Sequence, residues 1–508
     1  RDQFLKNWEA KNQRAAWMSK EAEMNAVREH KLFYGGAWHA PAAGDYRPSH
    51  NPADGTLLAR VANASGDDVD RAVTAALAGF TEWRDVLPLE RARLLREVAS
   101  VIRRNAAELV ALDAEDCGNP VAELRGDVQV AAALMEYFAG LVTEMKGASI
   151  PVGPNAVNFS VRQPFGVVAR ILAFNHPFLF CVGKIAAPLA AGNAVIVKPS
   201  EQAPLSALRF AELVEGLLPT GTFSVLTGGA EAGAALAAHP KVAMISLVGS
   251  AAAGRALMRE ASATLKPVLL ELGGKNALIA YGDADPDQVA SALAQGMNFA
   301  WCGQSCGSTS RAFVHADIYD EVVAQVAARV APFQPGDPSD SATSMGAIIS
   351  AAQTERILGY IAHAKEEGAR LVCGGAPPAD PALSGGFFVE PTIFADVTPD
   401  MRVAREEIFG PVLAIMKWSD EADMLGAVNG LDYGLTCSIW TRDLERAHRT
   451  AMAVEVGYVW INETSRHILG APFGGMKQSG IGREECLGEL LAFTQEKNIY
   501  ISLAAKSR

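Results

Sequence analysis

Two cysteines in one short segment are the first residues of this chain that could do chemistry. The segment WCGQSCGSTSR, residues 301–311, places Cys302 and Cys306 four residues apart in a chain with seven cysteines. Such a pair could form a disulfide, bind a metal ion, or combine one nucleophilic thiol with a second cysteine that has no chemical role. Small residues flank Cys306, which leaves its sulfur open to a reactant.

The sequence context weakens the first two interpretations. An odd number of scattered cysteines is typical of a reducing compartment rather than of a disulfide framework. A metal site needs further Cys or His ligands, and the nearest histidines in sequence are His239 and His315. We therefore predict no metal site. Cys302, beside Trp301, is interpreted as a small buried residue.

The elements that must position such a thiol begin near residue 165, where short Val/Ile/Leu-rich runs alternate with helix-like segments. Continuous apolar runs indicate strands buried on both faces, and strand–helix–strand units predict a parallel sheet of dinucleotide-binding type. Ligands of such sheets bind beyond the carboxyl ends of the strands. The predicted strands cover residues 167–174, 193–200, 223–229, 242–250 and 267–274.

Polar residues follow two of these strands. Asn175 has a side-chain amide that can donate two hydrogen bonds, although a turn or cap role is common for asparagine. Lys198 and Glu201 could form a solvated ion pair or could hold ribose hydroxyl groups. In the second case the carboxylate would repel a 2′-phosphate and favour NAD over NADP.

Glycines follow two others. In GSAAAG, Gly249 and Gly254 open a helix whose free N–H groups could hold a pyrophosphate, although the segment is not GxGxxG and is a weak signal by itself. Glu271 stands directly before LGG. It could be a helix cap, or a base with space around it.

Length and composition limit the class of protein. A chain of 508 residues should divide into two or three domains, and 49% hydrophobic with 20% charged residues is ordinary globular composition. The formal charge of −12 argues against non-specific nucleic-acid binding. No apolar run reaches the roughly 18 residues that span a bilayer. We expect a cytoplasmic protein with neither nucleic-acid nor membrane partners.

The order of the motifs resembles that of the aldehyde dehydrogenase superfamily. The resemblance covers nearly the whole chain from about residue 31. Any one motif is a modest match, whereas the full series in family order and near-family spacing is specific. The motifs are ILAFNHPF, GNAVIVKPSEQAPLSA, SLVGSAAAG, LELGGK, GQSCGSTSR, EEIFGPV and PFGGMKQSGIGRE.

The resemblance implies a catalytic role for five residues. Cys306 would be the nucleophile, which makes Cys302 the bystander. Asn175 and the Cys306 backbone N–H would stabilise the oxyanion, and Glu271 would activate the water that hydrolyses the thioester. Lys184 and Glu484 would form a proton path behind Glu271.

The resemblance also implies an NAD site, with NADP possible but less favoured because of Glu201. Glu407 would hold the nicotinamide ribose with Phe409 beside the ring, and Gly229 would let the backbone approach the cofactor. The implied cofactor-binding residues are Lys198, Glu201, Gly229, Gly249, Ser250, Glu407 and Phe409.

Departures from the family pattern gather where the aldehyde is expected. Gly183 replaces a frequent bulky aromatic residue and predicts a wider tunnel. Arg466 could pair with a carboxylate or sulfonate of the substrate, or could face solvent or a neighbouring subunit. A wide pocket also fits an aromatic aldehyde, and His176 could donate to a substrate hydroxyl. The remaining candidates in this pocket are His467 and Phe473.

The expected architecture is a Rossmann-like cofactor domain, a second α/β catalytic domain and a small β arm. Residues 1–29 are a polar N-terminal extension without an assigned function. The predicted ranges are 30–143 and 165–273 for the NAD-binding domain, 274–480 for the catalytic domain, and 144–164 with 490–508 for the oligomerisation arm. The arm predicts a homodimer or homotetramer, because its hairpin and tail strand lack an obvious local sheet.

Three functions follow from these residues. The preferred one is NAD-dependent oxidation of a small-molecule aldehyde to its carboxylic acid. A CoA-acylating semialdehyde dehydrogenase is the second, although such enzymes typically lack a carboxylate at the position of Glu271. The third, a catalytically idle structural protein, is disfavoured by the joint presence of Cys306, Glu271 and Asn175.

Overall fold

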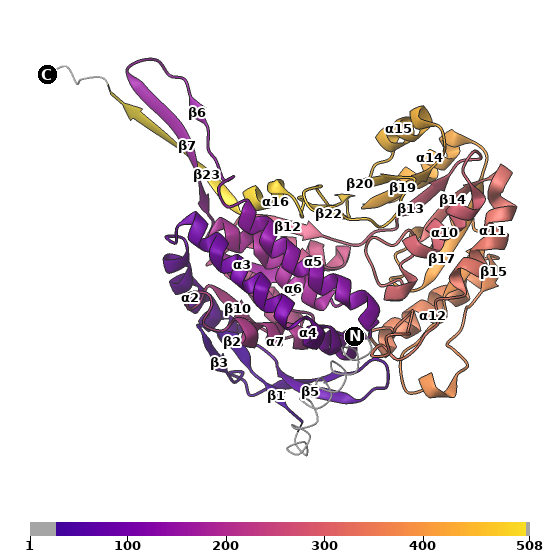
Figure 1. Cartoon of the computed structure of the whole chain (residues 1–508), viewed down its shortest axis with the longest axis horizontal. Helices are drawn as coiled ribbons and strands as arrows, with labels where there is room; N and C mark the ends of the chain where they lie inside the picture. Colours follow the sequence, from indigo (N-terminus) through magenta and orange to yellow (C-terminus); the bar gives the residue numbers. More distant parts are fainter. Residues whose placement is uncertain (1–26, 504–508) are drawn as a thin grey trace, which may run out of the picture.

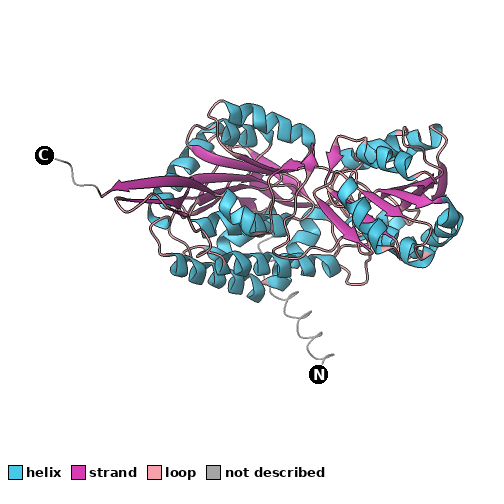
Figure 2. Ribbon diagram, turned by 90° about the horizontal axis from the view of Figure 1, so that it is seen from above, coloured by secondary structure: helices cyan, strands magenta, loops and turns pink. Residues whose placement is uncertain are grey.

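Two large sheets organise residues 27–503, the part of the chain that the computed structural model describes. The first occupies the indigo-to-magenta half of Figure 1 and the second the orange half. Figure 2 shows helices above and below the strands of both. This arrangement confirms the predicted α/β fold class with parallel-strand sheets. Most of the predicted extension at residues 1–29 lies outside the described residues.

The first sheet has eight strands in the order β22-β12-β11-β8-β9-β10-β2-β3. Its five central strands are parallel and match the five apolar runs of the sequence: β8 (Val167–Ile171), β9 (Ala194–Lys198), β10 (Phe223–Val225), β11 (Val242–Val248) and β12 (Val268–Glu271). Antiparallel strands complete its edges: β2 (Leu32–Tyr34), β3 (Ala37–His39) and β22 (Gly480–Ile481).

Helices cover both faces of this sheet, which explains its continuous apolar strands. One face packs against α3 (Pro88–Arg104), α4 (Ala106–Cys117), α5 (Val121–Gly140), α6 (Pro177–Ala191) and α7 (Leu205–Val214). The opposite face packs against α2 (Gly66–Trp83), α8 (Ala230–Ala238) and α9 (Ala251–Ser262).

The second sheet has seven strands in the order β15-β16-β17-β14-β13-β19-β20. All neighbours are parallel except the edge pair of β15 and β16. The strands are β13 (Ala277–Ala280), β14 (Arg311–His315), β15 (Arg370–Cys373), β16 (Thr392–Ala395), β17 (Val412–Trp418), β19 (Thr436–Trp440) and β20 (Tyr458–Ile461). One face packs against α10 (Pro286–Gly296) and α11 (Ala316–Val330), the other against α12 (Ala351–Glu366), α13 (Arg402–Arg405) and α14 (Glu421–Asn429).

A three-stranded arm projects from the first half of the molecule (Figure 1). It contains β6 (Ser149–Ile150), β7 (Ala156–Pro164) and β23 (Thr494–Ser502), which follows α16 (Leu487–Ala492). β23 pairs along its whole length with β7 in antiparallel register, from Thr494 opposite Pro164 to Ser502 opposite Ala156. The tail strand therefore finds a partner in its own chain. Assembly through the arm stays a prediction, as do the domain boundaries.

Two small sheets complete the described residues. β1 (Glu29–His30), β5 (Leu57–Ala62) and β4 (Tyr46–His50) form a three-stranded sheet, and β18 (Tyr433–Gly434) pairs with β21 (Met476–Lys477). No helix within residues 27–503 combines the length and the apolar character needed to cross a bilayer.

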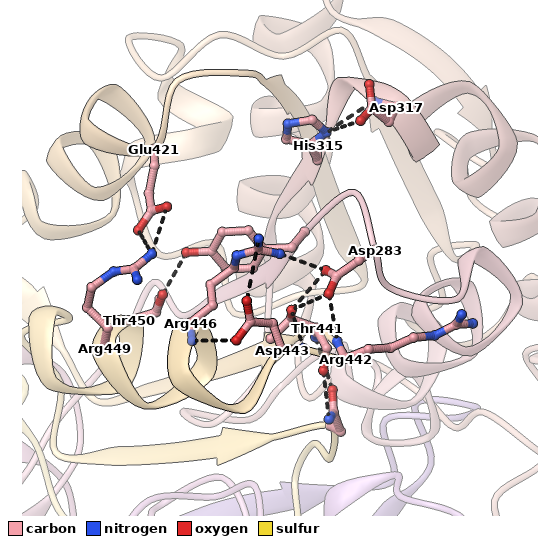
Figure 3. Close-up of polar contacts among 12 residues, drawn as sticks. Asp283, His315, Asp317, Glu421, Thr441, Arg442, Asp443, Arg446, Arg449 and Thr450 are labelled. Atoms are coloured by element: carbon pink, nitrogen blue, oxygen red, sulfur yellow. Dashed lines mark hydrogen bonds and ion pairs between the residues drawn. The ribbon is translucent and has the colours of Figure 1, made fainter.

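A cluster of ion pairs lies beside the second sheet (Figure 3). The Asp283 carboxylate accepts hydrogen bonds from the Thr441 hydroxyl at 2.8 Å and from the Arg442 N–H at 3.1 Å. Arg446, on α15 (Leu444–Ala453), approaches Asp283 to 3.1 Å, and Arg449 approaches Glu421 to 3.1 Å. These contacts hold α15 against the ends of β13 and β19. We call these residues the outer cluster.

Candidate active site

Cys306 lies in a loop between the short 3-10 helix η2 (Phe299–Trp301) and β14. Its side chain is partly exposed, and the neighbouring backbone is tied down by Asn276. The Asn276 amide donates to the Cys306 carbonyl at 2.7 Å and to the Ser308 carbonyl at 3.0 Å. The sequence analysis missed Asn276. Its only signal was a polar side chain in the short buried segment between two strands.

Cys302 has a different environment. It is fully buried in the core of the second sheet, and its thiol donates to the Ala347 carbonyl at 3.5 Å. Burial raises the pKa of this thiol to about 12. Cys302 is therefore a buried, unreactive cysteine, as its position beside Trp301 in the sequence suggested.

Glu271, the last residue of β12, faces the Cys306 thiol. The Cys306 Sγ lies 3.3 Å from Glu271 Oε1 and donates to it. Burial, reinforced by the negative charge of Glu271, raises the pKa of Cys306 well above its usual range. The thiol is therefore protonated in this arrangement, and its proton points at a carboxylate that can accept it.

A chain of buried charges continues behind Glu271. The Lys184 ammonium lies 3.0 Å from Glu271 Oε2 and also hydrogen-bonds Glu484. Arg170 donates to Glu484 at 2.8 Å, and its Nη2 lies 3.9 Å from Glu489. We call these five residues the inner cluster. The predicted partners Lys184 and Glu484 thus meet Glu271 directly, although they come from α6 and from the segment after β22.

Burial gives the three carboxyl groups of this cluster different proton affinities. It raises the pKa of Glu271, an effect that Lys184 partly offsets. Burial also opposes ionisation of Glu484, but the charges of Lys184 and Arg170 hold its pKa at about 2. Burial and the neighbouring Glu484 charge raise the pKa of Glu489 to about 8. At neutral pH, Glu484 is therefore an anion and Glu489 is protonated.

The sequence analysis missed Arg170 and Glu489. Arg170 interrupts the apolar strand β8, and this single charge in a buried run was a usable signal. Lys184 stands out in the same way on α6, a helix that starts with Pro177 and is apolar on all sides. A charge in such a position requires a partner from elsewhere in the fold.

Asn175 follows β8 and is buried. Its carbonyl accepts a hydrogen bond from the Asn119 amide at 2.8 Å, and within residues 27–503 its own side-chain amide has no hydrogen-bond partner. His176, next in sequence, lies 2.8 Å from Asp127, and its ring contacts that of Trp301 in a tilted arrangement with 4.4 Å between the ring centroids. The Asn175 segment therefore lies against the loop that carries Cys306.

A cavity that is open to solvent adjoins this loop. Ser305, Glu407 and Phe409 are among the residues that line it. The Glu407 carboxylate accepts a hydrogen bond from the Gly274 N–H at 3.0 Å, and burial raises its pKa. A side chain at Gly273 would collide with this carboxylate, because its Cβ would lie 2.0 Å from Glu407 Oε2. The predicted nicotinamide residues and the Cys306 loop thus share one cavity.

A second cavity, also open to solvent, includes Glu201, Thr227 and Gly228 in its lining. The Lys198 ammonium lies 3.7 Å from Glu201 Oε2. Gly229 begins α8. The structure therefore gathers three of the predicted cofactor residues at the carboxyl ends of β9 and β10.

Gly249 and Ser250 lie at the carboxyl end of β11, where α9 begins. The Ser250 hydroxyl accepts a hydrogen bond from the Ala253 N–H at 3.2 Å, as an N-cap does. The Gly249 N–H donates to the Glu271 carbonyl at 3.0 Å. This contact ties the start of α9 to the strand that carries the candidate base.

The predicted substrate residues have mixed positions. His467 lies 3.1 Å from Glu485 and 4.4 Å, between ring centroids, from Phe473. Burial opposes protonation of His467, but the Glu485 carboxylate raises its pKa above the usual value. Arg466 has a side chain that is 69% exposed and lies 3.8 Å from Glu463. That surface position matches the solvent-facing alternative more closely than the anion-binding one.

Gly183 does not widen the pocket as expected. A Cβ at this position would lie 2.7 Å from the Leu134 Cδ1 atom of α5. The volume released by the absent side chain is therefore filled by a neighbouring leucine. No group of three or more His, Cys, Asp or Glu side chains within residues 27–503 is arranged to hold a metal ion.

Comparison with known proteins identifies the family. The model of the aldehyde dehydrogenase family matches residues 38–499. Aldehyde dehydrogenase tropH of Talaromyces stipitatus is 50% identical over 482 residues, which cover 93% of this chain and 93% of that protein. This chain belongs to the aldehyde dehydrogenase family.

Solved structures agree in fold. PnpE from Pseudomonas sp. WBC-3 superposes with a TM-score of 0.92 at 38% identity, covering 94% of this chain and 99% of that one. PnpE has also been solved in complex with nicotinamide adenine dinucleotide. The indole-3-acetaldehyde dehydrogenase AldA of P. syringae, solved with NAD⁺ and IAA, gives 0.92 at 35% identity and covers 96% of this chain and 99% of its own.

Proposed function

We propose that this chain is an NAD-dependent aldehyde dehydrogenase that converts an aldehyde to its carboxylic acid through a thioester on Cys306. The observation that carries the proposal is the 3.3 Å contact between the Cys306 thiol and Glu271, with Lys184 bonded to the far oxygen of that carboxylate. Family membership supports the reaction class. The chemistry follows from the residues in three steps.

In the first step Glu271 takes the thiol proton while the Cys306 sulfur attacks the aldehyde carbon. A carbon–sulfur bond forms, and the carbonyl oxygen becomes an oxyanion. The Asn175 amide, which has no partner within residues 27–503, and the Cys306 N–H are the donors available to it. Donors of this kind contribute about 3–4 kcal/mol each to the transition state.

The residues at the strand ends fit NAD. Each end of the proposed cofactor site has a cavity, Gly273 leaves room for Glu407, and α9 begins with a glycine and a capping serine. When bound, NAD supplies the two-electron acceptor for the hydride that leaves the substrate carbon as the thioester forms. Glu407 and Phe409 would orient its nicotinamide end, and Lys198 and Glu201 its adenosine ribose. The NAD complexes of PnpE and AldA support this assignment.

Before the last step, Glu271 passes the proton it took from Cys306 to solvent. Glu271 then takes a proton from water, and the resulting hydroxide attacks the thioester. The carbon–sulfur bond breaks, the acid leaves, and Cys306 regains a proton. Burial favours this role because it raises the pKa of Glu271 toward neutrality. A carboxylate this close to the sulfur also favours water over CoA as the acceptor of the acyl group.

We further propose a polar, aromatic aldehyde as the substrate. Phe473 would provide an apolar surface, and His467, whose pKa Glu485 raises, would be a hydrogen-bonding partner for a hydroxyl or carboxylate group. His176, held by Asp127, would provide a second polar edge near the cysteine loop. AldA, a structural neighbour, acts on an indole-bearing aldehyde by name, which supports an aromatic substrate.

The test compares Cys306→Ala with Cys302→Ala. We expect Cys306→Ala to lose NADH formation and still bind NAD, because the thiol is needed only for chemistry. Cys302→Ala should keep its activity. NADH formation from benzaldehyde and 4-carboxybenzaldehyde, each with and without CoA, is the measurement. Normal turnover of Cys306→Ala, or turnover only with CoA, would overturn the proposal.

A further inference from the structure

An arginine without a role in the mechanism above lines the second cavity. Arg47 lies on β4 and lines that cavity together with Glu201 and Thr227. Its guanidinium also lies against Gly229, since a Cβ built there would be 2.7 Å from Arg47 Nη1. Gly229 is the position at which the backbone is expected to approach the cofactor. The guanidinium therefore borders the proposed path of the adenosine.

The single negative charge of Glu201 does not balance the positive charges of both Lys198 and Arg47. Lys198 pairs with Glu201 at 3.7 Å, whereas Arg47 has no carboxylate within ion-pair distance among residues 27–503. Burial lowers the pKa of Lys198, and the charge of Arg47 acts in the same direction. The two cations are thus close enough to affect each other. Asp45, the nearby acid on the same segment, accepts a hydrogen bond from Asn63 at 2.6 Å and does not line the cavity.

An unpaired guanidinium beside a ribose site suits a phosphate. Arginine binds phosphate oxygens with two parallel N–H donors, and such charge-assisted bonds are stronger than neutral ones. Glu201 acts in the opposite sense, because its carboxylate would repel a 2′-phosphate. Its side chain is 46% exposed and has room to turn toward solvent. The ribose would therefore lie between the anionic side chain of Glu201 and the cationic side chain of Arg47.

We propose that Arg47 is a cofactor-binding residue that accepts a 2′-phosphate on the adenosine ribose, so that this chain uses NADP as well as NAD. The inference rests on the proposed function, which places the adenosine in this cavity. Arg47 favours NADP, Glu201 favours NAD, and the balance between them sets the ratio. The expectation of NAD as the favoured cofactor, with NADP possible, is compatible with this balance.

Nucleotide binding without any aldehyde tests the proposal. Calorimetric titration of the full chain with NAD, NADP, 5′-AMP and 2′-AMP separates the phosphate contribution from the rest of the cofactor. We expect Arg47→Ala to weaken NADP and 2′-AMP about tenfold more than NAD and 5′-AMP, as for loss of one charge-assisted contact. Glu201→Gln should shift the NADP-to-NAD ratio the other way.

The matched control is Arg60→Ala on the neighbouring strand β5. Arg60 belongs to the same small sheet, pairs with Glu29 at 3.4 Å and does not line the cavity. We expect this variant to leave all four affinities unchanged. If it changes them as Arg47→Ala does, the effect comes from the small sheet and the proposal fails.

The outcomes separate the two proposals. Equal weakening of NAD and NADP by Arg47→Ala, or no binding of 2′-AMP to the unmodified chain, overturns the role of Arg47 while the aldehyde chemistry stands. Failure of the unmodified chain to bind any of the four nucleotides overturns both. Binding of all four without aldehyde oxidation would leave Arg47 supported and overturn the proposed reaction.

Discussion

The inner and outer clusters are built from the same residue types but differ in exposure. Side chains of the inner cluster are at most 9% exposed, whereas Asp283, Arg446, Arg449 and Glu421 of the outer cluster are 32–61% exposed. Water screens the outer charges, so their ion pairs contribute little to stability and mainly hold α15 in place. In the inner cluster, burial amplifies each interaction and divides the carboxyl groups into one anion, one neutral acid and one proposed base.

That difference gives opposite expectations for the same chemical change. Converting a carboxylate to an amide removes a reactive group in one cluster and a surface contact in the other. Removing a cation leaves buried carboxylates without a partner in the inner cluster. In the outer cluster it leaves carboxylates that water can hydrate. Paired substitutions in the two clusters can therefore confirm or break the comparison.

The largest difference is expected for Glu271→Gln against Asp283→Asn. The first variant loses the proposed base, and we expect turnover to fall by about 10²–10⁴-fold, the usual contribution of general base catalysis. The second should keep normal turnover. Steady-state NADH formation with benzaldehyde is the measurement, followed by rapid mixing to separate thioester formation from its hydrolysis.

The pH profile sharpens this prediction. Because burial raises the pKa of Glu271, activity of the unmodified chain should rise with pH through a pKa above the usual carboxyl range. Residual activity of Glu271→Gln should lack that rise. A variant that retains both the rate and the acid limb would show that Glu271 is not the base.

The second prediction compares Lys184→Met with Arg446→Met. Removing Lys184 leaves Glu484 and Glu271 buried with less compensation, and breaking a buried pair typically costs about 3–5 kcal/mol of unfolding free energy. Removing Arg446 breaks only part-exposed contacts, for which about 0–1 kcal/mol is expected. Urea unfolding of both variants is the measurement.

A double variant keeps this test informative if Lys184→Met folds poorly. Lys184→Met combined with Glu484→Gln removes one cation and one anion together, so part of the lost stability should return. Equal losses for Lys184→Met and Arg446→Met would contradict the comparison. So would a double variant less stable than Lys184→Met alone.

The sequence predicted what depends on local pattern. The central strands were found because continuous apolar runs such as Ala194–Lys198 are buried on both faces. Cys306 and Glu271 were found because each stands beside small residues in a recognisable motif. Glu271 ends β12, whereas Cys306 lies in the loop before β14, so their meeting at 3.3 Å depends on how the two sheets lie against each other.

The remainder depends on residues that are distant in sequence. Arg170 meets a partner 314 positions away, and no local pattern identifies Glu484 as that partner. The space beside Gly183 is decided by Leu134 on another helix, so the identity of the glycine could not predict a wider pocket. Likewise β23 pairs with β7 across most of the chain length. Arg47 reaches the second cavity from a sheet that carried no motif.

The last comparison concerns Glu489→Gln and the pH dependence of stability. Burial raises the pKa of Glu489 to about 8 in the folded chain, whereas an exposed glutamate titrates at about 4.3. Between these values the folded state holds more protons than the unfolded state. Its unfolding free energy therefore falls, through this group, as pH rises from about 4.3 through about 8.

Glu489→Gln stays neutral at every pH and removes this contribution. The variant should gain stability relative to the unmodified chain between pH 5 and pH 9 in urea unfolding, whereas Glu421→Gln in the outer cluster should show no such trend. A trend of the opposite sign would mean that Arg170, 3.9 Å away, keeps Glu489 ionised. The carboxyl groups of the inner cluster would then all be ionised, as in the exposed cluster. Burial would no longer explain why their pKa values differ.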